Sequence, residues 1–211
     1  MGGGMIERWM TLVGRVFEAG RTEVARAVYE DLIARYGASE RRYHNLGHIQ
    51  ACLQLLDTVR GLAGSADAIE LAIWFHDAIY DSHRSDNEEC SAQLAAEALA
   101  RLGAPGTLAT VVSDLILATR HQAVPARPDA AILVDIDLAI LGQPAAIFDA
   151  YEAGIRAEYG WVAEEDFRLG RSKVLRGFLR RPRIYATEYF HEALERAARE
   201  NLARSLARLA A

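Results

Sequence analysis

The stretch Trp74-Phe75-His76-Asp77-Ala78-Ile79-Tyr80-Asp81 places a His-Asp pair inside an otherwise apolar run. Adjacent residues on a helix point about 100° apart, so an ion beside such a helix can contact both His76 and Asp77. Burial of an imidazole and a carboxylate is costly unless core hydrogen bonds or a divalent cation compensate for the lost hydration. The pair therefore predicts a helix in the core, and it leaves open whether its role is structural or metal binding.

The composition is that of a globular, helical protein. Of the 211 residues, 51% are apolar and 25% are charged, which is an ordinary balance for a folded domain. Leu, Ala, Glu and Arg are abundant, and alternating runs of Val, Ile and Thr are missing, so helices are favoured over strands. We expect a single domain over residues 1–211, with residues 1–4 as a flexible lead-in.

Charge and cysteine content exclude several classes of protein. A net charge of -5 argues against binding in a nucleic-acid groove. Cys52 and Cys90 form no metal or disulfide motif and indicate reduced thiols. No basic segment precedes an apolar one at the N-terminus, and no eighteen apolar residues run together, so we expect a cytoplasmic protein without a membrane span. The oligomeric state has no signature in the sequence.

Apolar residues recur at helical spacing along the whole chain, which predicts an all-α bundle of about eight to ten helices. Ser85 and Glu88 fit a capping box at the start of the fifth helix. The predicted helices cover residues 6–19, 22–36, 49–59, 66–80, 85–102, 105–121, 131–141, 144–159, 164–179 and 182–211.

Four residues of metal-ligand type lie on apolar faces of three of these helices: His48, His76, Asp77 and one of Asp135 or Asp137. Two imidazoles and two carboxylates suit one divalent ion of Mn, Fe, Co, Ni, Mg or Zn, with water in the remaining positions. Such an ion lowers the pKa of a bound water far enough to supply hydroxide near neutral pH. The set therefore indicates hydrolytic chemistry.

The order His, His-Asp, Asp resembles the HD superfamily of metal-dependent phosphohydrolases, and in particular its predicted, largely uncharacterised bacterial branch. The resemblance covers about residues 9–185. It is carried by the blocks Arg42-x-His44-Asn45-x-x-His48-Ile49, Phe75-His76-Asp77-Ala78-x-Tyr80-Asp81, Asp86-Asn87-Glu88-Glu89-x-Ser91-Ala92, Asp135-x-Asp137-Leu138-x-Ile140-Leu141-Gly142 and Ile155-Arg156-x-Glu158-Tyr159.

The resemblance implies an all-α fold in which His48, His76, Asp77 and a later Asp hold one ion. It makes Asp137 the first choice for that ligand and Asp135 a contact that fixes the tautomer of a ligating histidine. The implied activity is hydrolysis of a phosphate ester or anhydride in a small phosphorylated metabolite, such as a nucleotide. Two alternatives stay open: an HD-type di-iron oxygenase, and a non-catalytic module that binds a metal or a nucleotide.

Further residues are candidates for catalysis. Asp81 follows Asp77 by one turn if the helix persists, where it could orient the attacking water or accept its proton; otherwise it is a solvated turn residue. His44 and Arg42 are predicted to contact phosphate or the metal ligands. If Asn45 is the N-cap of the next helix, His44 lies outside that helix.

Five positions are predicted to bind substrate. Arg42, Asn87, Glu88 and Arg156 belong to the blocks above, and His121 lies between an apolar helix and a loop. A basic segment at residues 168–183 could also supply arginines to a phosphate, although charged helix faces are usually just solvated.

Overall fold

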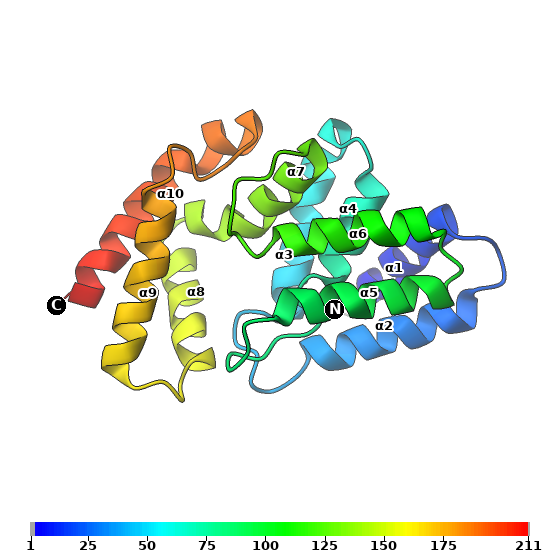
Figure 1. Cartoon of the computed structure of the whole chain (residues 1–211), viewed down its shortest axis with the longest axis horizontal. Coiled ribbons are helices and arrows are strands. Elements are labelled where there is room, and N and C mark those ends of the chain that lie inside the picture. The colour runs from blue at the N-terminus through cyan, green and yellow to red at the C-terminus, as the bar shows by residue number, and fades with distance from the viewer. Residues whose placement is uncertain (1–2, 211) are drawn as a thin grey trace. The chain divides into compact units, whose positions relative to one another are not determined.

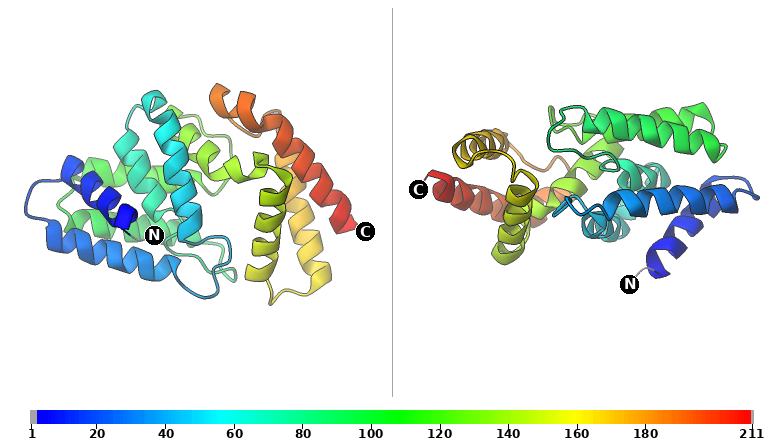
Figure 2. Two further views of the ribbon diagram at one scale, coloured as in Figure 1. Left: turned by 180° about the vertical axis from the view of Figure 1, so that it is seen from behind. Right: turned by 90° about the horizontal axis from the view of Figure 1, so that it is seen from below.

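The buried centre of the fold is helix α4 (Ala66–Phe75), in which every residue from Ala68 to Phe75 is buried. A helix that is apolar on all sides can be stable only when other helices surround it. In the computed structural model, which describes residues 3–210, α4 packs against α1, α3, α5 and α6 (Figure 1). Figure 2 shows the α5–α6 pair and α1 on opposite sides of α4.

All regular secondary structure in the described residues is helical, which confirms the all-α prediction. Two short 3-10 helices, η1 and η2, accompany ten α-helices in residues 3–210. The elements are α1 (Gly3–Val16), α2 (Thr22–Tyr36), α3 (Leu46–Val59), η1 (Arg60–Leu62), α4 (Ala66–Phe75), α5 (Asn87–Arg101), α6 (Gly106–Ala118), α7 (Pro128–Asp137), η2 (Leu138–Gly142), α8 (Ala145–Glu158), α9 (Glu164–Leu179) and α10 (Glu188–Ala210).

The chain forms two compact units, Met1–Leu133 and Val134–Ala211. The first contains α1 to α6, and the second contains η2 and α8 to α10. Helix α7 begins in the first unit and ends in the second. Among the described residues no single helix has both the length and the apolar character of a membrane span, although Pro128–Gly142 and Ala145–Glu158 meet that test together across a bend of 103°.

An aromatic cluster joins α1 to α4 in the first unit. The ring of Trp9 meets the rings of Trp74 and Phe75 edge-on, at centroid distances of 5.5 and 6.2 Å. The indole nitrogen of Trp9 donates to the carbonyl of Ala25 at 2.8 Å, so this buried polar group also fixes α2.

A buried carboxylate reinforces the same contact. The side chain of Glu70 is 1% exposed and forms ion pairs with Arg8, Arg15 and Arg60. Arg8 Nε lies 2.7 Å and Arg15 Nη2 lies 3.1 Å from its oxygens. A buried charge must be paired to be tolerated, so these three arginines hold α1 and η1 against α4.

The second unit is held together by buried polar side chains from α10. Asn201 donates to the carbonyls of Leu141 and Gln143 at 2.9 and 2.8 Å, which ends η2. Glu195 accepts hydrogen bonds from the backbone N–H groups of Ile184 and Tyr185. These contacts satisfy backbone groups that would otherwise be buried without partners.

Several predicted helix boundaries are wrong for identifiable reasons. Helix α10 begins at Glu188 rather than near residue 182, because side-chain carboxylates accept the N–H groups of residues 184–187. The expected capping box is absent: α5 has Asp86 as its N-cap, without a side-chain cap bond, and Arg84 binds the Asp86 carboxylate instead. Gly3 and Gly4, expected in the lead-in, are helical, whereas residues 1 and 2 lie outside the described part.

Candidate metal centre

The first imidazole comes from the first turn of α3. Asn45 adopts an extended conformation, and its side-chain oxygen accepts the N–H of Gly47 at 2.8 Å, so it is the N-cap. Helix α3 therefore begins at Leu46, which leaves His44 outside it and places His48 on its buried face, 7% exposed.

The second imidazole lies at the end of α4. His76 is the C-cap residue and is 1% exposed. Its Nδ1 lies 2.9 Å from the carbonyl oxygen of Ile73, and because a carbonyl can only accept, we assign the proton of the neutral ring to Nδ1. The Nε2 lone pair is then available to a ligand, which is the usual arrangement of a metal-binding histidine.

Asp77 completes a triangle of ligand atoms. Its Oδ2 lies 3.2 Å from His76 Nε2 and 3.5 Å from His48 Nε2, and the two Nε2 atoms are 3.2 Å apart. Around a cation with bonds of about 2.0–2.2 Å, neighbouring ligand atoms are roughly 3 to 3.5 Å apart. The spacing of these three atoms therefore fits a shared divalent ion.

The electrostatics of Asp77 also favour a cation. Burial alone would raise the pKa of Asp77, but a protonated His76, and to a smaller extent His44 and His48, lower this pKa well below its ordinary value; a metal ion on Nε2 of the neutral ring would supply positive charge in place of that proton. Asp77 is therefore ionised at neutral pH and can only accept or coordinate.

A buried arginine that the sequence reasoning missed holds the backbone of this turn. Arg41 Nη1 donates to the carbonyls of His44 at 3.0 Å and Asp77 at 2.6 Å, and its Nη2 donates to the carbonyl of Ala78 at 3.0 Å. The guanidinium lies over the ring of Tyr36, 5.1 Å from its centroid. Arg41 thus links the segment before α3 to the turn after α4. Nothing in the sequence separates it from its neighbour Arg42, which is exposed.

The two candidate aspartates of α7 have different environments. Asp135 is fully buried, and its carboxylate accepts hydrogen bonds from Ala186 N, Thr187 N and Thr187 Oγ1 at 2.8, 2.7 and 2.6 Å. Its carboxylate therefore fixes the two residues that precede α10, and its predicted role beside a ligating histidine stays a prediction. Asp137, the last residue of α7, forms with His48 and His76 a group that could hold a metal ion.

The loop after Asp77 removes Asp81 from the predicted catalytic position. Helix α4 ends at Phe75, so the turn that would place Asp81 above Asp77 does not form. The Asp81 side chain is 49% exposed, and its Oδ1 accepts the N–H of His83 at 2.9 Å and lies 2.9 Å from His83 Nδ1. Asp81 is therefore a turn residue, the alternative considered above.

Two residues of the Asp86–Ala92 block fix this loop. The side-chain amide of Asn87 accepts the N–H of Asp81 at 3.1 Å and donates to its carbonyl at 3.0 Å. Ser91 Oγ accepts from Ile79 N at 3.0 Å and donates to Ile79 O at 3.2 Å. The amide of Asn87 therefore holds the backbone of this loop, and its predicted role in substrate binding stays a prediction.

Other predicted residues lie in the same unit as the His-Asp turn. The ring of His44 stacks on Tyr80, with centroids 4.1 Å apart, and His44 contributes to the lowered pKa of Asp77. Glu88 is half-buried at the start of α5; burial raises its pKa, and the charge of Asp77 raises it further. His121 follows α6 with a φ of 55°, a left-handed conformation that is rare outside glycine and is often found at functional sites.

Arg156 is engaged in contacts within the second unit. Its Nε lies 3.0 Å from Glu164 Oε2, and its Nη1 and Nη2 donate to the carbonyls of Tyr159 and Val162 at 2.6 and 3.1 Å. The guanidinium therefore closes the turn between α8 and α9, and its predicted contact with a substrate stays a prediction.

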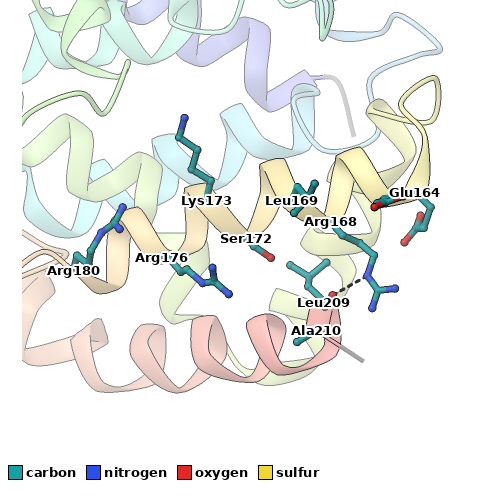
Figure 3. Close-up of a pocket in the computed structure, with 10 residues that line it drawn as sticks. Glu164, Arg168, Leu169, Ser172, Lys173, Arg176, Arg180, Leu209 and Ala210 are labelled. Atoms are coloured by element: carbon teal, nitrogen blue, oxygen red, sulfur yellow. Dashed lines mark hydrogen bonds between the residues drawn. The ribbon is translucent and has the colours of Figure 1, made fainter.

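The basic segment does not gather around one point. Arg171 is largely buried, where it donates to the hydroxyl of Tyr151 at 2.7 Å and forms an ion pair with Glu152. A groove of about 750 Å³ runs beside α9 and the end of α10, and Arg168 reaches across it to the carbonyl of Leu209 at 2.7 Å (Figure 3). Some of these cations therefore serve the packing of the second unit.

No protein-family model, curated protein or solved structure matches the chain.

Proposed function

We propose that this protein is a metal-dependent phosphohydrolase of the HD type, which cleaves a phosphate ester or anhydride in a small metabolite such as a nucleotide. The observation that carries the proposal is the triangle formed by His48 Nε2, His76 Nε2 and Asp77 Oδ2, with sides of 3.2 to 3.5 Å in a buried setting. An all-α fold and the order of the sequence blocks also support it.

In this proposal His48, His76, Asp77 and Asp137 hold one divalent ion. When bound, such an ion polarises a phosphoryl oxygen and lowers the pKa of a water. The chain contributes orientation: the Ile73 carbonyl fixes the ring of His76, and Arg41 fixes the backbone of Asp77. Pre-set ligand orientation of this kind strengthens metal binding about 10- to 100-fold in other sites.

The remaining roles belong to side chains of the first unit. We place His44 against the phosphoryl group of the substrate, because its ring is stacked on Tyr80 and it lies near enough to Asp77 to lower the pKa of that carboxylate. Glu88 is assigned to proton transfer, because a carboxylate with a raised pKa can exist in both protonation states nearer to neutral pH. His121 and Arg42 are assigned to substrate contacts.

The test combines metal analysis with an activity screen. The purified protein, stripped and reloaded with Mn²⁺, Co²⁺, Ni²⁺, Zn²⁺, Fe²⁺ or Mg²⁺, is screened against nucleotides and sugar phosphates by phosphate release. We expect about one ion per chain and turnover of at least one phosphorylated compound. His76→Ala should lower metal affinity more than about 100-fold and abolish turnover, whereas His83→Ala, at a side chain 61% exposed, should change neither.

Each alternative has its own outcome. Full metal occupancy without turnover of any phosphorylated compound would identify a binding module. Two iron ions per chain with an electronic absorption band would identify a di-iron oxygenase. Absence of divalent-ion binding in the wild type would refute the metal centre itself.

A further inference from the structure

Three cations of the basic segment take no part in the packing of the second unit. Lys173 and Arg176 on α9, and Arg180 at its C-cap, are exposed, and within the described part of the chain their side chains have no hydrogen bond or ion pair. Arg171 and Arg204, in contrast, each form an ion pair with a carboxylate. The three unpaired charges are therefore available to a ligand.

These three cations lie in one sector of α9. At about 100° and 1.5 Å per residue, Lys173, Arg176 and Arg180 fall within about 60° around the helix axis and within about 10.5 Å along it. Like charges three or four residues apart destabilise a helix. The helix dipole favours cations only in the last turn, which contains Arg176, so it does not account for Lys173. Within the described residues no ion pair offsets the cost of this cluster.

The cluster borders the groove beside α9 and the end of α10. The groove has a volume of about 750 Å³, and sites for small molecules usually measure about 300 to 1,000 Å³. Arg168 Nε donates to the carbonyl of Leu209 at 2.7 Å and so fixes the end of α10 as one wall. In Figure 3 Arg176 lies on the side of α9 toward α10, and Lys173 lies on the other side. Their long side chains can therefore reach an anion on this face from both sides.

The rest of the groove lining is not cationic. Leu169, which is 65% exposed, Leu209 and Ala210 provide apolar surface. Glu164 and Glu165 line the groove from the first turn of α9, far from Arg180. Their carboxylates repel phosphate groups at that end, and the net charge of -5 disfavours a long polyanion such as nucleic acid. A small ligand with its negative charge at one end and a carbon skeleton at the other fits this distribution.

We propose that this groove binds a small organic diphosphate or triphosphate. The phosphate groups lie against Lys173, Arg176 and Arg180, and the carbon skeleton lies on Leu169 and Leu209. Arginine forks match the geometry of phosphate oxygens, and lysine adds a compact point charge. The site belongs to the second unit alone and does not depend on the proposed catalytic function.

Isothermal titration calorimetry of the full chain tests the site with ADP and with pyrophosphate. The protein is stripped of metal with a chelator, so that no ion at the metal centre contributes to phosphate binding. We expect ADP to bind with a dissociation constant of about 10 to 100 µM at 150 mM salt, and the affinity to fall as the salt concentration rises. Arg176→Gln or Arg180→Gln should weaken binding at least about tenfold, because each removes hydrogen bonds to a charged group.

Two control variants locate the ligand. Arg101→Gln removes an exposed arginine from the last turn of α5, in the first unit, and should leave the dissociation constant unchanged. His44→Ala should also leave it unchanged, and a loss of ADP binding in this variant would place the ligand at the metal centre and overturn the proposal. Since the substituted α9 side chains are exposed, thermal unfolding should show the same stability for these variants as for the wild type.

The apolar wall gives a second readout that does not depend on charge. Leu169→Ser should weaken binding of ADP about three- to tenfold and leave binding of pyrophosphate unchanged, because only ADP has a carbon skeleton to lie on it. Absence of binding of both probes below about 1 mM would overturn the proposal. So would binding that is insensitive to the α9 substitutions. Tighter binding of a single strand of about 20 nucleotides, or of vesicles with phosphorylated headgroups, than of ADP would instead identify a nucleic-acid or membrane surface.

Discussion

Replacement of Asp135 by alanine is expected to destabilise the fold strongly while leaving the metal centre intact. The carboxylate accepts three hydrogen bonds, from Ala186 N, Thr187 N and Thr187 Oγ1. Hydrogen bonds to a charged group contribute about 1.5 kcal/mol or more each, which would give roughly 4.5 kcal/mol. Burial raises the pKa of Asp135, so desolvation offsets part of this gain, and about 3 kcal/mol is the expected loss.

A loss of about 3 kcal/mol should lower the melting temperature by roughly 6 to 12 °C in a chain of this size. Denaturant unfolding followed by circular dichroism measures the free energy, and titration with Mn²⁺ below the melting temperature measures metal affinity. The matched variant is Asp137→Ala, two residues along the same helix. We expect it to change the stability of the metal-free protein by less than about 1 kcal/mol and to weaken metal binding about 100-fold or more.

The opposite pattern would refute the reasoning. If Asp135→Ala abolished metal binding at unchanged stability, Asp135 would be the ligand, and its contacts with residues 186 and 187 would carry little energy. If Asp137→Ala left metal affinity unchanged, the fourth ligand of the proposed site would have to be sought elsewhere.

Three further variants test separate contacts. In Arg41→Lys a single ammonium replaces the guanidinium fork that donates to three carbonyls. Titration with a divalent metal ion should therefore show an affinity reduced about tenfold or more, and an unchanged affinity would contradict the positioning role of Arg41. Burial opposes ionisation of Glu195, but the N–H groups of Ile184 and Tyr185 and the charge of Arg199 outweigh burial and lower the pKa of this carboxyl. The stability that ionised Glu195 contributes is therefore present above the ordinary pKa of a glutamate and is lost as the pH falls through the lower pKa of the folded state. Glu195→Gln has no such proton to bind, so urea unfolding should show a smaller fall in its stability than in that of the wild type between pH 6 and pH 3, and parallel curves would refute this. His121→Gly removes the steric strain of a left-handed backbone conformation, with φ of 55°, at this position. Thermal unfolding should therefore show a stability that is unchanged or up to about 1 kcal/mol higher, while turnover falls because the imidazole is lost. A turnover equal to that of the wild type would show that the imidazole is dispensable.

The helices were predictable because their apolar spacing is regular and most of their ends carry a recognisable stop. The ranges for α2 and α9 agree with the prediction, and Asn45 acts as the N-cap considered for α3. The wrong helix boundaries occur where side chains from distant parts of the sequence bind the backbone N–H groups and override the local helical propensity. Residues 182–187 have helical propensity, but Asp135 and Glu195 accept their N–H groups and keep them as a loop.

The candidate site was predictable only in part, for a related reason. His48 and His76 could be recognised because polar residues on a buried helical face need a partner. The contributions of Arg41 and Asn87 depend on which backbone groups they meet, and the sequence does not specify a contact between Arg41 and the carbonyl of Asp77. Arg156 shows the converse: its place in a conspicuous block suggested a substrate contact, whereas the structure uses it to close a turn.

The arginines around Glu70 limit how far this protein can be shortened. Two of the three arginines come from α1, and the carboxylate that they neutralise lies on α4, the helix that has His76 as its C-cap. A truncated chain starting after Val16 would keep only Arg60 beside that buried charge and would also lose the Trp9 ring from the aromatic cluster. The N-terminal helix is therefore an integral support of the element that presents the histidine, and a minimal version of the metal centre has to include it.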